Sequence, residues 1–243
     1  MNTMPAQPFD EYADNYEGAL SKGLSVSGES KDYFAEHRVR ILQKRLRSKD
    51  YFPRRILDFG CGTGSGIPWL LAMDGVEAVI GTDVSTKSLE TASKRFEDPR
   101  VDFVETKTIT SMGKFDLIFC NGVFHHILPS DRAEVLTMIR NRLNPRGIFA
   151  LWENNPWNPG TRIIMSRIPF DRDAVTITPP EAERLAESAE FQILWRTHAF
   201  VFPSALRFLR WLEPLLSGLP LGAQYMVLAG LPAGQQQSQQ QNL

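Results

Sequence analysis

Several features that define other classes of protein are scarce or absent in this 243-residue sequence. It has only two cysteines, Cys61 and Cys120, which are too few for a disulfide framework. No apolar run approaches the ~18 residues that a membrane span needs, and the first ten residues lack the charged and then apolar regions of a signal peptide. The formal net charge of −1 supplies no basic field for nucleic acid. We therefore expect a globular cytoplasmic protein without a nucleic-acid partner.

Strand-like and helix-like segments alternate along most of the chain. Such alternation predicts βαβ units, a parallel sheet and helices on both faces. The last two strands follow a different pattern, which predicts an antiparallel edge. The expected fold class is therefore α/β, a Rossmann-like, doubly wound, mostly parallel seven-stranded sheet with an antiparallel edge strand. The expected strands are 55–60, 77–85, 101–106, 115–122, 147–154, 191–202 and 224–231, and the expected helices include 65–73, 86–97, 129–143, 179–189 and 204–216.

The two ends of the chain differ from this alternating centre. A helix is expected over residues 33–48, with an apolar face and a basic face that is either a solvated surface or a contact for an anionic partner. The last ten residues are rich in glutamine, which is typical of a disordered tail. The predicted organisation is a helical cap or lid over 1–50, a core over 51–233 with insertions at about 153–175 and 203–221, and a tail over 234–243.

A glycine-rich loop follows the first predicted strand, in the stretch "ILDFGCGTGSG". Its glycines do not match the dinucleotide fingerprint, because the third glycine of that pattern is replaced by Ser65 or Ile67, depending on the starting point. Asp58, just before the loop, disfavours a pyrophosphate and suits a ligand with an ammonium group. Asp83 ends the second strand, where a carboxylate accepts hydrogen bonds from a ribose. A ribose and a cationic end together describe S-adenosylmethionine.

Residues 55 to about 151 resemble the class I S-adenosylmethionine-dependent methyltransferases. The resemblance rests on "ILDFGCGTG", "IGTDVS", "FDLIFCNGVFHHI" and "LNPRGIFALWE", which occur in the family's order and spacing. It implies S-adenosylmethionine as cofactor and no metal. The usual acid after the third strand is missing, and Thr106 is the expected adenine contact in its place. The cofactor-binding residues that the resemblance implies are Asp58, Gly60, Cys61, Gly62, Gly64, Asp83, Val84, Thr106 and Asn121.

The acceptor side is less clearly marked. His126 and Glu153 are the candidate catalytic residues, because a histidine titrates near neutrality and Glu153 ends the fifth strand in a loop that faces the cleft. The alternatives are a structural histidine and a glutamate that braces its loop. The candidate substrate or lid residues are Tyr12, Tyr16, His125 and Asn154; the two tyrosines either close over the sulfonium or pack on the body of the protein.

The expected reaction is methyl transfer to a small-molecule acceptor, lipid- or sugar-linked molecules included, with release of S-adenosylhomocysteine. The segment over 204–216 places five leucines on one stripe, which favours core packing or a homodimer face, with peripheral membrane contact as the alternative. A non-catalytic subunit that retains the cofactor fold is the main alternative function, and a nicotinamide dehydrogenase is another. The sequence identifies neither the acceptor nor the attacked atom.

Overall fold

The computed structural model describes residues 23–171 and 174–232, so the predictions for Tyr12 and Tyr16 lie outside the described residues. The strands are β1 (Arg55–Phe59), β2 (Ala78–Asp83), β3 (Val101–Glu105), β4 (Phe115–Asn121), β5 (Leu143–Asn154), β6 (Gln192–Ala199) and β7 (Gln224–Gly230). The α-helices are α3 (Lys31–Arg47), α4 (Ile67–Leu71), α5 (Thr86–Arg95), α6 (Arg132–Asn141), α7 (Pro159–Arg167), α8 (Pro179–Ser188) and α9 (Glu213–Leu216). The 3₁₀ helices are η1 (Ser25–Ser27), η2 (Thr106–Ser111), η3 (Phe124–His126), η4 (Pro169–Asp171) and η5 (Ser204–Leu212).

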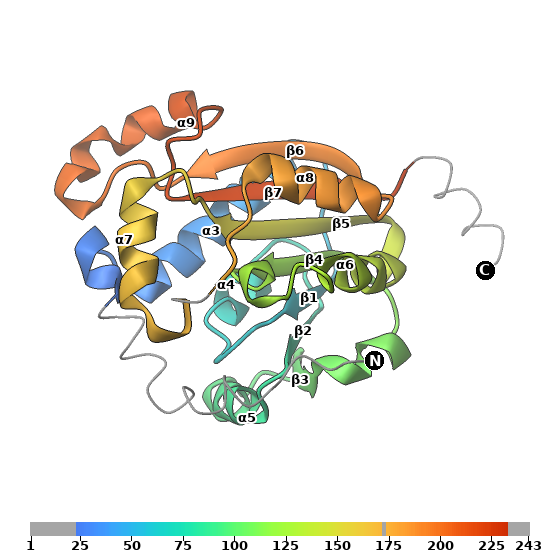
Figure 1. The fold of residues 1–243 in the computed structure, drawn as a ribbon. Helices are drawn as coiled ribbons and strands as arrows, with labels where there is room; N and C mark the ends of the chain where they lie inside the picture. The colour runs from blue at the N-terminus through green and yellow to red at the C-terminus, as the bar shows by residue number, and fades with distance from the viewer. Residues whose placement is uncertain (1–22, 172–173, 233–243) are drawn as a thin grey trace.

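The seven strands form one sheet in the order β3-β2-β1-β4-β5-β7-β6 (Figure 1). Strands β1 to β5 are mutually parallel, whereas β7 runs antiparallel to both of its neighbours, β5 and β6. The predicted fold class is confirmed, with the antiparallel strand β7 one place inside the edge strand β6. This order places the carboxyl ends of β1 and β4 side by side at the point where the chain reverses its direction of winding, which is where open α/β sheets bind their ligands.

The core is divided between the two faces of the sheet. On one face, side chains of β1, β4 and β5 such as Leu57, Ile118 and Phe149 pack with helices α6 and α8. On the other face, the alternate residues of the same strands pack with α3 and α4. Because both faces are covered, the central strands are nearly continuously buried, and this explains their unbroken apolar sequence.

Helix α3 belongs to this two-sided core. Ser30 caps its first turn by accepting a hydrogen bond from the backbone N–H of Tyr33. Its apolar face lies in the second cluster, where Leu42 is 0% exposed. The described part of the segment 1–50 therefore contributes a core helix as well as part of the site described below.

The expected helix over 204–216 is wrong in type and in burial. The chain forms the 3₁₀ helix η5, which is interrupted at Leu206, and then the single turn α9. Pro214 lacks a backbone N–H and its ring clashes with the preceding turn, so it cannot continue a helix that begins at Ser204. Of the alternatives for its apolar stripe, core packing is wrong: Phe208, Trp211 and Leu215 are 68%, 71% and 76% exposed, and neither helix has a buried residue.

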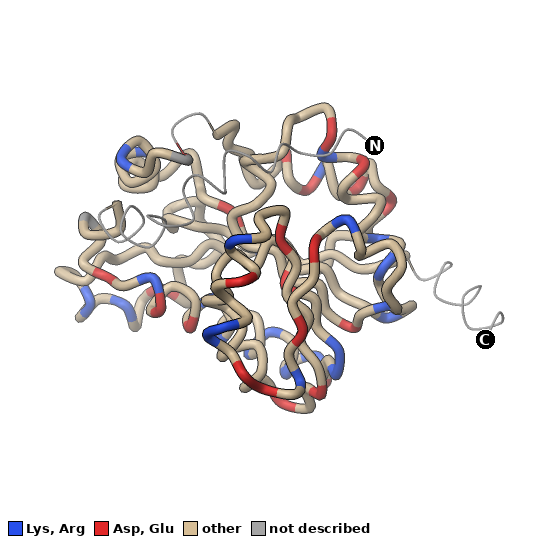
Figure 2. The backbone as a smooth tube through the Cα atoms, turned by 90° about the horizontal axis from the view of Figure 1, so that it is seen from below, with Lys and Arg blue, Asp and Glu red and all other residues tan. Residues whose placement is uncertain are grey.

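Among the described residues, basic and acidic residues are interspersed along the outer helices and loops (Figure 2). None of the helices described in this structure is long and apolar enough to cross a membrane.

Candidate active site

The glycine loop leaves the carboxyl end of β1 and turns back toward β2. The backbone N–H groups of Gly60 and Cys61 both donate to the carbonyl oxygen of Thr82, at 2.8 and 2.9 Å. Gly60 and Gly62 have positive φ angles of 74° and 53°, a conformation that side-chain-bearing residues rarely adopt. A Cβ on Gly60 would lie 2.3 Å from a methyl carbon of Val123, whereas a Cβ on Gly62 would meet open space. The loop therefore presents bare backbone to a cavity.

Asp83 at the end of β2 fixes this loop. One of its carboxylate oxygens accepts a hydrogen bond from the N–H of Gly62 at 2.8 Å, and the other accepts one from the N–H of Ser85 at 2.9 Å. Each carboxylate oxygen has a second lone pair, so the group retains capacity for hydroxyl donors of a ligand. The sequence identified Asp83 by its distance from the glycines, and the structure adds that it braces the loop.

A pocket opens in front of this loop, and we call it the glycine-loop pocket. Six of the predicted cofactor-binding residues line it: Gly60, Gly62, Asp83, Val84, Thr106 and Asn121. The candidate catalytic residue His126 lines it as well. Three other predicted cofactor residues do not line it. Cys61 is buried against Gly81, Gly64 faces the ring of Phe96, and Asp58 lies beside Gly66.

Asp58 is a buried acid at this position, only 4% exposed. Burial and then the negative charge of Asp83 raise the pKa of its carboxyl group, and Arg38 lowers it; together they bring it from 3.8 to about 7. A cationic group placed next to this buried carboxyl would stabilise its ionised form.

A second pocket adjoins the first, and we call it the histidine pocket. It shares Asn121, Gly122 and His126 with the glycine-loop pocket, so the two cavities meet at the carboxyl end of β4. Lys31 and Arg38 of α3 line it on one side, and Arg38 belongs to the basic face for which an anionic partner was one of the two expected uses. It is also lined by His125, Asn154, Thr161 and Asp171.

The candidate catalytic residue Glu153 does not line either pocket. Its side chain is buried behind η3, where it accepts hydrogen bonds from the backbone N–H of Phe124 at 2.8 Å and from Nδ1 of His125 at 2.6 Å. Of the two roles expected for Glu153, the geometry favours bracing: it holds the His125 ring in place. Asn154, the next residue, does line the histidine pocket and accepts a hydrogen bond from Gln224.

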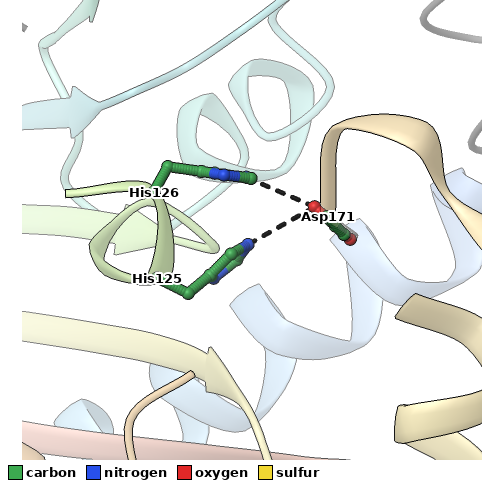
Figure 3. A group of neighbouring side chains, drawn as sticks. All are labelled: His125, His126 and Asp171. Carbon is green, nitrogen blue, oxygen red and sulfur yellow. Dashed lines mark ion pairs between the residues drawn. The ribbon is translucent and has the colours of Figure 1, made fainter. Parts of the chain in front are cut away.

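Asp171 joins the two histidines from the opposite side. Its carboxylate lies 3.5 Å from Nε2 of His125 and 3.3 Å from Nε2 of His126, and Figure 3 shows both rings converging on it. Burial lowers the pKa of His125, but the carboxylates of Glu153 and Asp171 outweigh it and raise the pKa to about 10. No sequence motif marks Asp171, which follows His126 by 45 residues and was not among the expected site residues.

A methyltransferase domain family matches residues 57–149 of the chain. Malonyl-[acyl-carrier protein] O-methyltransferase of Legionella pneumophila is 30% identical over 129 residues, which are 51% of this chain and 41% of that protein. Trans-aconitate 2-methyltransferase of Rhizobium leguminosarum is 32% identical over 100 residues, which are 40% of this chain and 38% of that protein. The matched part therefore spans less than half of the length of these relatives.

Solved structures match over a larger share of the chain. A TehB-like S-adenosylmethionine-dependent methyltransferase from Corynebacterium glutamicum has a TM-score of 0.61 at 18% identity, covering 91% of this chain and 99% of that one. Magnesium protoporphyrin IX methyltransferase from Synechocystis, solved with bound S-adenosylhomocysteine, has a TM-score of 0.61 at 15% identity, covering 93% and 99%. At these identities the likeness establishes the fold.

Proposed function

The chain belongs to the class I S-adenosylmethionine-dependent methyltransferases, and on that premise we propose that it transfers the donor's methyl group to a small anionic acceptor. One observation carries the proposal: two pockets of different character meet at Asn121, Gly122 and His126. Bare backbone and a carboxylate line the first, and cationic side chains and histidines line the second. Methyl transfer requires two ligands that meet end to end, and this arrangement supplies two adjoining sites.

The residues of the glycine-loop pocket fit the cofactor. Gly62 leaves space that a side chain would occupy, and Asp83 keeps acceptor capacity for the hydroxyls of a ribose. Val84 and Thr106 line the part of the pocket assigned to adenine. Asp58 does not line this pocket; its buried carboxyl lies behind the loop, beside Gly66, where a positive charge nearby favours its ionised form. When bound, S-adenosylmethionine supplies a methyl group that its sulfonium already makes electrophilic.

The protein's contribution to the reaction is therefore mainly positional. Holding an acceptor in line with the donor and excluding water contributes up to ~7–11 kcal/mol in well-oriented reactions. His126 lines both pockets, so it lies at the reacting end of the acceptor. Asn154 lines the acceptor side only, and we assign it a substrate-contact role.

The charge of the histidine pocket supports an anionic acceptor. Lys31 and Arg38 line it, and Arg38 is held in place by a hydrogen bond from its Nε to Oε1 of Gln224 at 2.8 Å. Two of the relatives are named for trans-aconitate and for a malonyl group, both of which carry carboxylates. We therefore propose a carboxylate-bearing small molecule as the acceptor.

Calorimetry with S-adenosylmethionine and S-adenosylhomocysteine tests the donor site. We expect one site per chain and a loss of binding of at least ~tenfold in Asp83→Ala, because a hydrogen bond to a charged group contributes ~1.5–3 kcal/mol. Asp102→Ala is the matched control, since it removes an exposed carboxylate from the neighbouring strand β3. Equal affinity in the two variants would count against the placement of the donor.

Turnover separates an enzyme from a non-catalytic subunit. Incubating the protein with methyl-labelled donor and a set of small carboxylic acids, followed by mass spectrometry, is expected to show a methylated product and S-adenosylhomocysteine. Arg38→Gln is expected to raise KM for the acceptor while donor affinity stays unchanged. Donor binding without a product from any acceptor would favour the non-catalytic alternative.

A further inference from the structure

The group formed by His125, His126 and Asp171, which we call the His-His-Asp cluster, has the composition of a metal site. One ligand atom from each of the three residues lies within 4.8 Å of the other two. Two imidazoles and one carboxylate on the same side of a cavity are the donor set of many sites for divalent transition metals that keep open positions for a substrate.

The spacing within the cluster is longer than that of hydrogen bonds. The distances from Asp171 to the two Nε2 atoms are 3.5 and 3.3 Å, whereas charge-assisted N–H···O hydrogen bonds are about 2.7–2.9 Å. Ligand atoms that are each ~2.0–2.2 Å from one ion lie about 3.0–3.5 Å apart in octahedral or tetrahedral geometry. The separations from Asp171 therefore match the edges of a coordination polyhedron.

Glu153 supplies the support that a metal-binding histidine requires. It holds Nδ1 of His125 at 2.6 Å, which leaves Nε2 directed at Asp171 and His126. A metal-ligating histidine almost always donates its other ring N–H to a carboxylate or carbonyl oxygen, because this bond fixes the ring and its tautomer. Glu153 is itself fixed by the backbone N–H of Phe124, so the arrangement is rigid.

The charge balance also suits a dication. Glu153 and Asp171 are both buried, and together they bring two negative charges to the cluster. A dication at His125 and His126 neutralises these two charges. All three ligands line the histidine pocket, so the remaining coordination positions open on that cavity.

We propose that the His-His-Asp cluster binds one divalent first-row transition ion, Zn²⁺ or Fe²⁺, whose open positions face the histidine pocket and accept an anionic oxygen ligand. As a metal ligand, His126 does not act as the proton acceptor that its place in the sequence suggested. The identity of the oxygen ligand as the methyl acceptor rests on the proposed function, whereas the metal site itself does not.

The test uses the full chain without a histidine tag, stripped with a chelator and titrated with Co²⁺ as a spectroscopic substitute. We expect visible absorption typical of four- or five-coordinate Co²⁺ that saturates at one equivalent and disappears when Zn²⁺ is added. His126→Ala and Asp171→Asn are expected to abolish the band. Glu153→Gln is expected to weaken binding by ~10–100-fold, the usual effect of removing such a supporting carboxylate.

His37→Ala is the matched control, because it removes a histidine of α3 that does not line the histidine pocket and whose Nδ1 lies 2.8 Å from the backbone carbonyl oxygen of Tyr33. It is expected to keep the band. Circular dichroism confirms the fold of each variant, and calorimetry with S-adenosylhomocysteine checks the donor site in Asp171→Asn, which does not line the glycine-loop pocket. No band at stoichiometric Co²⁺, or an unchanged band in folded His126→Ala and Asp171→Asn, would overturn the proposal. Metal binding without donor binding would count only against the proposed function.

Discussion

Replacing Asp58 with asparagine is expected to stabilise the ligand-free protein at neutral and alkaline pH. The carboxyl group is buried in the loop region, and burial, followed by the charge of Asp83, raises its pKa from 3.8 to about 7. Asparagine has nearly the same shape and carries no charge. The substitution therefore removes the cost of ionising a buried acid while it preserves the packing around Gly66.

The sign and size of the effect follow from proton linkage. Between pH 3.8 and about 7 the folded protein holds a proton on Asp58 that the unfolded chain has released, so stability falls as the pH rises. The loss is roughly 1.4 kcal/mol for each pH unit, or about 4 kcal/mol in total, and it is complete above pH 7. Asp58→Asn is therefore expected to match the wild type near pH 4 and to exceed its free energy of unfolding by up to about 4 kcal/mol at pH 8.

Urea denaturation followed by circular dichroism at several pH values between 4.5 and 8 measures this difference. Asp102→Asn, at an exposed carboxylate, is the control and is expected to show a small difference at every pH. Titrating groups that do not interact with Asp58 contribute equally to the wild type and the variant, so they cancel in the comparison. A difference between Asp58→Asn and the wild type that stays constant with pH would refute the reasoning.

Two further pairs of variants test the loop and the body of the fold by urea denaturation. Gly60→Ala is expected to be more destabilising than Gly62→Ala: both incur ~1–2 kcal/mol for the left-handed backbone, but only the first also forces a methyl group against Val123. Equal losses would contradict the geometry of the loop. Leu42→Ala is expected to lower the free energy of unfolding by ~2–5 kcal/mol because α3 is part of the core. Trp211→Ser is expected to change the free energy of unfolding by no more than ~0.5 kcal/mol because that ring is exposed. A larger loss in Trp211→Ser than in Leu42→Ala would contradict the burial of α3 and the exposure of η5.

The glycine loop illustrates what local sequence can determine. The series from Gly60 to Gly64 predicted a loop where a ligand can approach the backbone, and the structure has positive φ angles of 74°, 53° and 78° at Gly60, Gly62 and Gly64. Only residues close in sequence are needed for that prediction, because a tight turn after a buried strand leaves few backbone solutions. The place of Asp83 followed from the same local rule, since β2 must end at the same edge of the sheet as β1.

The segment from Ser204 to Leu216 illustrates where local pattern fails. Its leucines have helical spacing, which predicts a buried stripe, but Pro214 and the irregular geometry at Leu206 divide it into two short helices. Burial depends on whether another element lies opposite a face, and sequence spacing contains no information about that. The stripe is therefore a property of the sequence that the fold does not use for its core.

By itself, the sequence determined the alternating order of strands and helices, the parallel sheet and the glycine loop after the first strand, because each depends on residues near one another in the chain. Tertiary structure alone decided that Glu153 lies behind His125, that Asp171 reaches both histidines, and that Arg38 faces the second pocket. The first two contacts join β5 and η4 to η3 at the carboxyl edge of the sheet, and Arg38 of α3 bonds Gln224 of β7. Their partners are separated by tens of residues, and only the packing of whole elements brings such groups within bonding distance.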